Sequence, residues 1–401
     1  MSGRTQGEVQ RAGATRRAWL AIGLGFAAFA AGCSGFPGSN FWSDAPPPPA
    51  QPATAIGTGQ VKVGLVLPLS AAGNAGHAAQ SMKNAAELAL SEFSNPNLQL
   101  LVKDDGGTAP GAQQAAQQAI GEGAEIILGP LFAHSVGAAA QIARPRGVPV
   151  IAFSTDANVA ANGVYLLSFL PESDVDRVID YAVGNGKRSF AALVPDNAYG
   201  SLVDAEFRQV VARKGGRVVG LEHYPADRQQ IQEPVRRVAE AARQADSIFI
   251  PDTADAVTPV VQGLGAGGID RKRVQLMGTG LWDDPKIFAD ASLQGAWFAA
   301  PDPAGYRNFA GRYRTKFGQD PVRTATLAYD AVSLVAALVK TQGAQRFAPE
   351  TLTNASGFSG VDGIFRFRAD GTNQRGLAVL RVAPGGAQVI SPAPRTFSAG
   401  T

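Results

Sequence analysis

Cysteine and histidine are scarce in this chain of 401 residues. It has one cysteine, Cys33, so no disulfide can form within a single molecule. Its three histidines, His77, His134 and His223, lie far apart and lack the spacing to carboxylates that metal sites need. We therefore expect no metal ion and no cofactor.

Motifs that mark catalysis are also missing. The sequence contains neither a G-x-S-x-G elbow nor a Walker loop. A glycine-rich stretch at 263–268 follows an expected helix rather than a strand, which favours a helix end over a dinucleotide loop. No nucleophile and base occur together in a recognisable pattern, so we predict no catalytic residue and no enzyme activity.

An excess of one charge sign is absent as well. The computed pI of about 9.0 comes from the first 32 residues, which carry four arginines and one glutamate. Without them, 32 basic and 32 acidic residues remain. A balanced chain argues against nucleic acid as a partner.

No apolar run is long enough to span a bilayer as a stable helix. The run at 18–31 follows Arg11, Arg16 and Arg17, an arrangement typical of a signal peptide. It ends Ala-Ala-Gly-Cys at 30–33, which resembles a bacterial lipoprotein cleavage box. This resemblance implies a signal peptide at 1–32 and lipidation of Cys33; the alternative is an ordinary signal peptide with an incidental cysteine.

Two further features of the leader concern export. Ser34, directly after the cysteine, resembles an outer-membrane rather than an inner-membrane address. The stretch 15–20 loosely resembles a twin-arginine signal, so the export route stays open between the two common systems. Residues 33–60, rich in proline, glycine and serine, have too little apolar surface to fold alone. We expect them to form a disordered tether between the membrane anchor and a periplasmic body.

The body begins with alternating strands and helices. The apolar run 61–67 stops at Pro68, and a polar loop and an alanine-rich helix at 78–93 follow. Such a run suits a parallel strand that is buried on both faces. Further strands are expected at 98–103, 124–128, 148–152 and 164–169, with helices at 110–121 and up to 144 between them. This order predicts a doubly wound parallel sheet over 61–169.

A second round of the same order covers 170–300. We expect strands at 190–194, 217–223, 247–250, 274–277 and 296–300, with helices between them. Two helices, 303–317 and 322–340, are expected to return to the first lobe and complete it over about 301–345. The last stretch, about 346–392, is predicted to complete the second lobe, with strands 364–367 and 377–382 joined as a hairpin by a glycine turn.

Taken in order, several stretches resemble the type I periplasmic binding proteins of the Leu/Ile/Val-binding branch. These are VKVGLVLPLSAAG from Val61, GPLFAHSV from Gly129, RGVPVIAFSTD from Arg146, LVPDNAYG from Leu193 and VQLMGTG from Val274. The resemblance covers about 61–390. It implies two α/β lobes joined by crossover strands, with a ligand held in the cleft between them.

The candidate ligand-binding residues follow the carboxyl ends of the expected strands, where open α/β sheets bind ligands. On the first lobe these are the hydroxyl-bearing residues Ser70, Ser135, Ser154 and Thr155. On the second lobe they are two aromatic residues, Tyr199 and Trp282. Helix N-termini beside them would add N–H groups for an anion or carbonyl. Ser70 could instead only cap its helix, and Tyr199 and Trp282 could be packing residues.

Departures from the resembling family concern the ligand. The family's carboxylate-gripping serine falls on Ala133, its threonine on Asp156 and its ammonium-binding glutamate on Gly280. A shift of one residue would restore Thr155, and Asp283 or Asp284 could replace the glutamate. A buried Asp156 that faces a carboxylate would be unfavourable. Branched-chain amino acids therefore fit the sequence poorly.

Two functions agree with this pattern. The first is a lipid-anchored binding component that delivers a small polar, amino-acid-like ligand to the permease of an ABC importer. The second is an activator of a peptidoglycan synthase, since the VGLVLPLS and ILGPL stretches, the proline-rich tether and the cleavage box are similar to the penicillin-binding-protein activators. The helical-repeat domain of the best-known activators is missing here.

Overall fold

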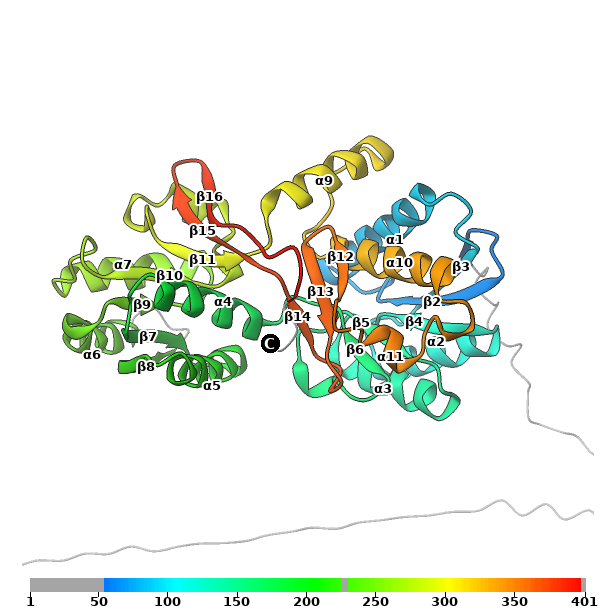
Figure 1. Ribbon diagram of the computed structural model, residues 1–401, viewed down its shortest axis with the longest axis horizontal. Helices are drawn as coiled ribbons and strands as arrows, with labels where there is room; N and C mark the ends of the chain where they lie inside the picture. The colour runs from blue at the N-terminus through cyan, green and yellow to red at the C-terminus, as the bar shows by residue number, and fades with distance from the viewer. Residues whose placement is uncertain (1–53, 226–229, 398–401) are drawn as a thin grey trace, which may run out of the picture. The chain divides into compact units, whose positions relative to one another are not determined.

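The computed structural model describes residues 54–225 and 230–397. Most of them form two α/β lobes, each built on one large sheet, and a three-stranded sheet accompanies the lobes (Figure 1). This confirms the predicted fold class of two doubly wound lobes joined by crossover strands. The predicted signal peptide, Cys33 and most of the predicted tether lie outside the described residues.

Lobe 1 contains a six-stranded sheet in the order β1-β3-β2-β4-β5-β6. Its strands are β1 (Thr54–Ile56), β2 (Val61–Leu67), β3 (Leu98–Asp104), β4 (Ala124–Leu128), β5 (Val150–Ala152) and β6 (Val164–Leu166). All neighbours pair in parallel except β1, which is antiparallel to β3. The helices of this lobe are α1 (Asn74–Glu92), α2 (Ala109–Gly121), α3 (Ala133–Ala143), α9 (Pro303–Phe317) and α10 (Ala325–Thr341).

Strand β1 was not predicted. The sequence assigned residues 33–60 to a disordered tether, but Thr54–Ile56 pairs with Leu100–Val102 of β3. The Gly59 N–H also donates to the Leu98 carbonyl at 3.0 Å. Backbone hydrogen bonds therefore hold this segment at the edge of the sheet, although its side chains supply little apolar surface.

The continuous apolar run of β2 is explained by burial on both faces. Val63, Leu65 and Leu67 pack into one core cluster with residues of α1 and α10. Val66 packs on the other face, in a cluster with residues of α2 and α3. Side chains of a strand alternate between faces, so helices on both faces require apolar residues at successive positions.

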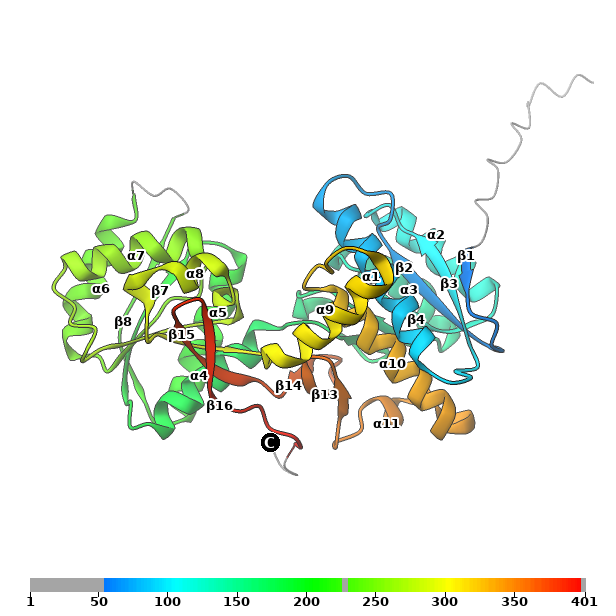
Figure 2. The same ribbon diagram turned by 90° about the horizontal axis from the view of Figure 1, so that it is seen from above.

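The chain returns to lobe 1 late in the sequence. Helices α9 and α10 lie beside α1 in both views (Figures 1 and 2). The Tyr313 hydroxyl of α9 accepts a hydrogen bond from Asn84 Nδ2 of α1 at 3.1 Å and lies 3.2 Å from Ser81 Oγ. Segments more than 200 residues apart in sequence thus form one helical layer.

Lobe 2 contains a seven-stranded sheet in the order β16-β15-β11-β10-β9-β7-β8. Its strands are β7 (Ser189–Pro195), β8 (Arg217–Tyr224), β9 (Ser247–Phe249), β10 (Gln275–Gly278), β11 (Trp297–Ala300), β15 (Ala378–Ala383) and β16 (Gly386–Ser391). The first five are parallel; β15 adds antiparallel to β11, and β16 adds antiparallel to β15. Its helices are α4 (Pro171–Gly184), α5 (Ala198–Arg213), α6 (Gln232–Ala241), α7 (Ala254–Ala266) and α8 (Pro285–Ala289).

The predicted C-terminal hairpin is wrong in its second strand. Strand β13 (Gly363–Phe367) pairs with β12 (Phe358–Gly360) and with β14 (Asn373–Arg375), which forms the hairpin around Gly371. Strand β15, predicted as the hairpin partner, instead joins the lobe 2 sheet beside β11. The glycine turn was placed correctly, but the chain changes sheets directly after β14.

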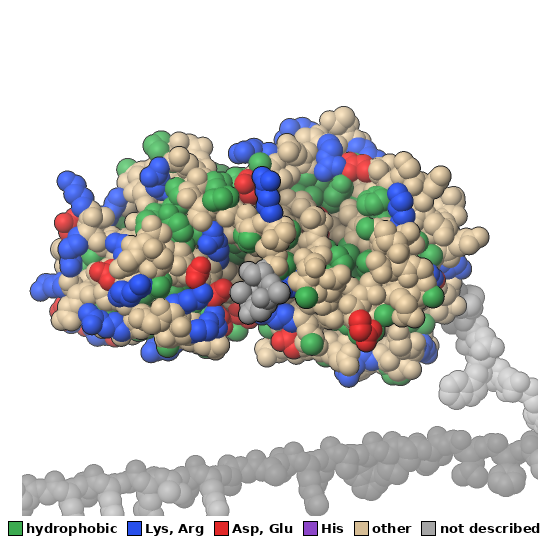
Figure 3. Space-filling model, in the orientation of Figure 1, with side chains coloured by type: hydrophobic (Ala, Val, Ile, Leu, Met, Phe, Trp, Pro, Cys, Tyr) green, Lys and Arg blue, Asp and Glu red, His purple; other side chains and the backbone are tan. Residues whose placement is uncertain are grey.

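Opposite charges on the lobe 2 surface are paired with one another. Figure 3 shows blue and red side chains interspersed over this lobe. Arg213 of α5 pairs with Asp176 of α4 at 2.7 Å, and Arg237 of α6 pairs with Glu222 of β8 at 2.7 Å. Among the described helices, none has the length and apolar character needed to cross a membrane.

Candidate functional site

The carboxyl edge of the lobe 1 sheet brings together three loops that carry predicted residues. After β2, the exposed Ser70 donates its backbone N–H to Asp104 Oδ1 at 3.2 Å, which joins the loops after β2 and β3. Burial alone would raise the pKa of Asp104, but hydrogen bonds from the Ser70 side chain and from nearby backbone N–H groups lower it. Ser70 is therefore held in place with its side chain at the surface of this edge.

Ser135 joins the next pair of loops from a buried position. It is fully buried in the first turn of α3, and its Oγ donates to the Thr108 carbonyl at 3.4 Å. The neighbouring His134 is exposed and places Nε2 2.9 Å from the Gly107 carbonyl. Ser135 thus connects the β4 and β3 loops and presents no surface to a ligand in this conformation.

Helix α3 begins without a side-chain cap. Its N-cap residue, Phe132, provides no hydrogen bond, and Val136 is the first residue whose N–H bonds back to the Phe132 carbonyl, at 2.9 Å. By contrast, Thr108 caps α2 and Asn197 caps α5 with their side chains. The N–H groups of Ala133 and the next two residues therefore remain without a helical partner, which favours an anion at this point.

The loop after β5 carries the last two predicted residues of lobe 1. Ser154 is 4% exposed, and its Oγ accepts the Asp156 N–H at 3.1 Å. Thr155 is exposed. Asp156 is exposed too, and it caps the turn that follows by accepting the Asn158 N–H at 3.0 Å. The conflict expected for a buried Asp156 beside a ligand carboxylate therefore does not arise here.

These loops are adjacent because glycine lets the chain turn tightly after β4. Gly129 has φ of +94°, and a Cβ on it would lie 2.0 Å from the Val66 carbonyl oxygen. The Phe153 N–H then bonds to the Pro130 carbonyl at 2.9 Å. The structure thus places Ser70, Ser135, Ser154 and Thr155 on one edge of the lobe 1 sheet.

On lobe 2, Tyr199 is positioned by the first turn of α5. It is partly exposed, and its hydroxyl lies 3.1 Å from Thr279 Oγ1 in the loop after β10. Burial and nearby carboxylates raise the pKa of Tyr199, although the Thr279 bond opposes this, so the phenol stays protonated. Tyr199 is therefore a hydrogen-bonding group at the carboxyl edge of the lobe 2 sheet.

Asp174 is a residue of this edge that the sequence did not reveal. From the first turn of α4, its Oδ2 accepts the Gly280 N–H at 2.9 Å. A Cβ on Gly280 would lie 3.2 Å from that oxygen. Burial raises the pKa of Asp174 to about 7, and the Gly280 bond and the charge of Arg375 oppose the rise. Asp174 thus approaches the backbone where the resembling family has a glutamate.

Two more carboxylates stand near Tyr199. Asp252 accepts a hydrogen bond from the buried Tyr224 hydroxyl at 2.7 Å. Glu172, two residues before Asp174, has a buried oxygen without a hydrogen-bond partner among the described residues. None of these three carboxylates forms an ion pair with a described residue. The edge of lobe 2 therefore carries acidic side chains, whereas the first turn of α3 offers N–H donors on lobe 1.

Trp282 lies in the core of lobe 2 rather than at its edge. Its side chain is fully buried, and its indole N–H donates to the Ile250 carbonyl at 3.1 Å. This position agrees with the packing alternative and leaves the indole no surface for a ligand in this conformation. The preceding residue, Leu281, is 41% exposed, and it is the large apolar side chain that the loop after β10 presents to solvent.

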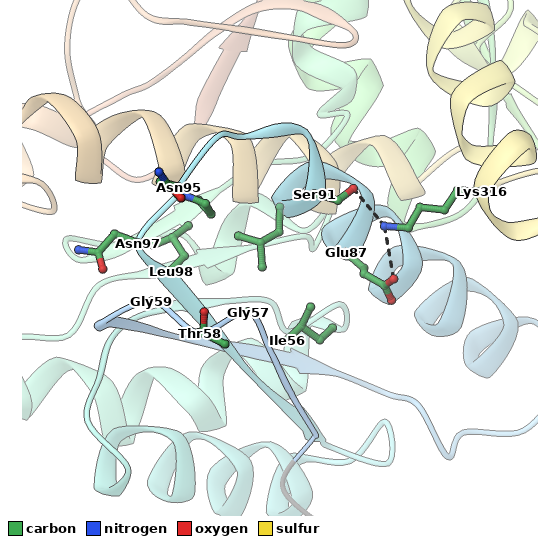
Figure 4. Close-up of a pocket in the computed structure, with 12 residues that line it drawn as sticks. Ile56, Gly57, Thr58, Gly59, Glu87, Ser91, Asn95, Asn97, Leu98 and Lys316 are labelled. Carbon is green, nitrogen blue, oxygen red and sulfur yellow. Dashed lines mark hydrogen bonds and ion pairs between the residues drawn. The ribbon is translucent and has the colours of Figure 1, made fainter.

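A cavity of about 700 Å³ lies at the opposite, amino edge of the lobe 1 sheet. Figure 4 shows it between the Gly57–Gly59 loop, the end of α1 and the loop before β3. The one lysine that lines it, Lys316, bonds to Ser91 Oγ at 3.0 Å and pairs with Glu87 at 3.4 Å. Its cation is thus already neutralised. No described group of three or more metal-ligating side chains is arranged to hold a metal ion.

The two sheets and the helices on their faces define a two-lobed α/β protein. The sequence profile of the periplasmic binding protein family matches residues 60–387. The chain therefore belongs to the periplasmic binding protein family, a class that binds solutes and is not catalytic. This membership indicates a periplasmic location.

Solved structures share the fold. A Rhodospirillum rubrum protein provisionally assigned to a branched-chain amino acid ABC transporter has a TM-score of 0.74 at 21% identity, over 82% of this chain and 99% of that one. A branched-chain amino acid ABC transporter ligand-binding protein from Burkholderia xenovorans has a TM-score of 0.68 at 19% identity, over 84% and 96%. A Rhodopseudomonas palustris solute-binding protein solved with 3,4-dihydroxybenzoic acid has a TM-score of 0.60 at 21% identity, over 84% and 97%.

One curated relative is an uncharacterized protein, RP748, from Rickettsia prowazekii. It is 22% identical over 157 residues, which cover 39% of this chain and 41% of the relative. This chain thus matches less than half the length of that relative. The comparisons give no support to the alternative function as a synthase activator.

Proposed function

We propose that this protein is the substrate-binding component of an ABC importer and that it binds a small, amino-acid-like solute between the carboxyl edges of its two sheets. Its partner is then a permease. The observation that carries this proposal is the opposite polarity of the two edges. The uncapped N-terminus of α3 offers N–H donors on lobe 1, and Asp174 offers a carboxylate on lobe 2.

The proposed contacts follow from this polarity. The carboxylate of the solute lies at the first turn of α3, with hydroxyls from Ser70 and Thr155 beside it. Its amino group, or another donor, lies at Asp174, and the Tyr199 phenol adds a further hydrogen bond. Leu281 covers the apolar part of the solute. Ser135, Ser154 and Trp282 support these loops from buried positions.

Aromatic acids are a second ligand class. One structural neighbour was solved with 3,4-dihydroxybenzoic acid and another, also from R. palustris, with benzoate. Such ligands have the carboxylate but lack the amino group. They would bind at α3 without using Asp174, so the two classes are separable by experiment.

The proposal also covers the leader. We infer that residues 1–32 are removed, that Cys33 carries the lipid, and that the segment up to residue 53 spaces the body from the membrane. Mass spectrometry of the purified full-length product measures this directly. A mature N-terminus other than lipidated Cys33 contradicts the anchor and leaves the binding proposal intact.

A thermal-shift screen tests the function itself. The purified body is tested with α-amino acids, with amides, and with aromatic and aliphatic monocarboxylates. A solute at a hundred times its Kd should add about 2.7 kcal/mol to the free energy of unfolding. If no solute of these classes raises the Tm, the importer proposal is wrong.

A further inference from the structure

A second cavity, of about 300 Å³, lies at the amino ends of β5 and β6 in lobe 1. These strand ends are opposite to the edge that carries Ser70 and Thr155. Val148, Phe347 and Pro349 give the cavity apolar walls, while Arg144 and Tyr165 give it polar groups. Ligand pockets of this size combine apolar walls with a few such polar groups.

Tyr165 is the first indication that this cavity is built for a ligand. The residue is 2% exposed, and its ring packs against Phe367 with centroids 5.4 Å apart. Its hydroxyl nevertheless makes no hydrogen bond with any described residue. Burial, and then the charge of Glu350, raise the pKa of Tyr165, so the phenol keeps its proton and can donate it. The hydroxyl is not among the described side-chain atoms that are both unpartnered and cut off from solvent, so it is open on the side of the cavity that Tyr165 lines and can donate to a ligand there.

Arg144 is the second indication. It is exposed at the end of α3, lines the cavity, and forms no ion pair or side-chain hydrogen bond with a described residue. Two other arginines of lobe 1 do have partners: Arg146 donates to the Ile142 carbonyl at 3.0 Å, and Arg346 pairs with Glu125 at 2.6 Å. The cavity therefore has an unpaired guanidinium at its mouth and an unpaired phenol within it.

We propose that this cavity is a second ligand site, which binds a small aromatic monocarboxylate. Arg144 pairs with the carboxylate, the Tyr165 hydroxyl donates to it, and Phe347 packs against the ring. The nearby carboxylate of Glu350 disfavours a second negative charge on the ligand. The site is separate from the solute position at the carboxyl edges and does not depend on it.

Fluorine NMR with 4-fluorobenzoate as the probe tests the proposal. We expect saturable binding to the full body, and a loss of affinity of roughly tenfold or more in Arg144→Gln, since the bond to a charged partner is removed. The neutral isostere 4-fluorobenzamide should bind at least tenfold more weakly than the acid. Arg146→Gln, a matched change two residues away, should leave the affinity unchanged.

Tyr165→Phe and Tyr199→Phe complete the test. Tyr165→Phe keeps the packed ring, so the Tm should stay unchanged while the affinity for 4-fluorobenzoate falls. If the probe binds at the carboxyl edges instead, Tyr199→Phe will weaken it and Arg144→Gln will not, which overturns the proposal. Equal binding of acid and amide, or no binding of either, overturns it too.

Discussion

The Asp174 carboxylate accepts a hydrogen bond from the Gly280 backbone N–H at 2.9 Å, although 106 residues separate the two positions. The contact joins the first turn of α4 to the loop after β10. It brings a carboxylate to the carboxyl edge of lobe 2, beside Tyr199 and Thr279. The proposed solute would therefore find an acidic group at Asp174, whereas position 280, where the resembling family has a glutamate, is a glycine.

Asp174→Asn should lower the affinity for an amine-bearing solute roughly tenfold or more, since a charged acceptor is lost. Burial raises the pKa of Asp174 to about 7. The ionised fraction, and with it the wild-type affinity for a cation, should therefore rise between about pH 6 and pH 8. In Asp174→Asn this rise should vanish. Isothermal titration calorimetry at the two pH values measures both effects.

Asp176→Asn is the matched control for this prediction. Asp176 lies two residues further along α4, and it pairs with Arg213 at the surface. Its replacement should leave both the affinity and its pH dependence unchanged. If Asp174→Asn also binds as wild type, the carboxylate does not contact the solute, and a ligand without an amino group becomes the better assignment.

Trp282 allows packing and ligand contact to be separated. Its indole N–H donates to the Ile250 carbonyl from a fully buried position, and the ring lies against Gly278. Trp282→Phe should lower the free energy of unfolding by about 1–2 kcal/mol through the lost bond and volume. Solute affinity should not change. Urea denaturation and calorimetry on one preparation measure the two quantities.

Trp297→Phe serves as the comparison for that variant. Trp297 is partly buried, and its ring meets Tyr181 edge to face with centroids 5.0 Å apart. We expect a smaller loss of stability there and again no change in affinity. A Trp282→Phe variant that keeps its stability but loses solute would instead place the indole in the binding site.

Local sequence patterns predicted most elements of the fold. Strand β4 lies at 124–128 and helix α9 at 303–317, both as expected. These segments have a clear apolar period and sharp ends at glycine or proline. The wrong predictions concerned pairing between strands that are far apart in the sequence. The sequence of residues 377–382 does not indicate whether β15 pairs with β11 or with β13, because both possible partners are apolar strands of similar length.

The site was less predictable than the fold. Because the carboxyl ends of parallel strands share an edge, the positions directly after the strands predicted that one edge would carry Ser70, Ser135, Ser154 and Thr155, as it does. Spacing could not show that Ser135 is fully buried, because its burial depends on the α2 loop that covers it. Asp174 looked like an ordinary helix residue, and only its contact across 106 positions gives it a role.

The last prediction concerns a buried carboxylate beside β12 and β13. Asp330 of α10 is 2% exposed; its Oδ1 accepts the Val361 N–H at 2.7 Å, and its Oδ2 has no partner among the described residues. Burial, and then the charge of Asp362, raise its pKa to about 7, although the Val361 bond and nearby arginines oppose this. The folded protein thus keeps a proton that the unfolded chain releases near its ordinary value of 3.8.

Stability should therefore fall as pH rises from about 4 to about 7, because the folded state binds the extra proton across that window. Asp330→Asn removes the ionisation and keeps the shape, so it should raise the free energy of unfolding by roughly 4 kcal/mol at pH 8 and by less than half of that at pH 5. Urea denaturation at both pH values measures this. The exposed Asp320→Asn should show neither effect. A loss of stability in Asp330→Asn that is equal at both pH values would mean that Asp330 is ionised and paired with Arg375.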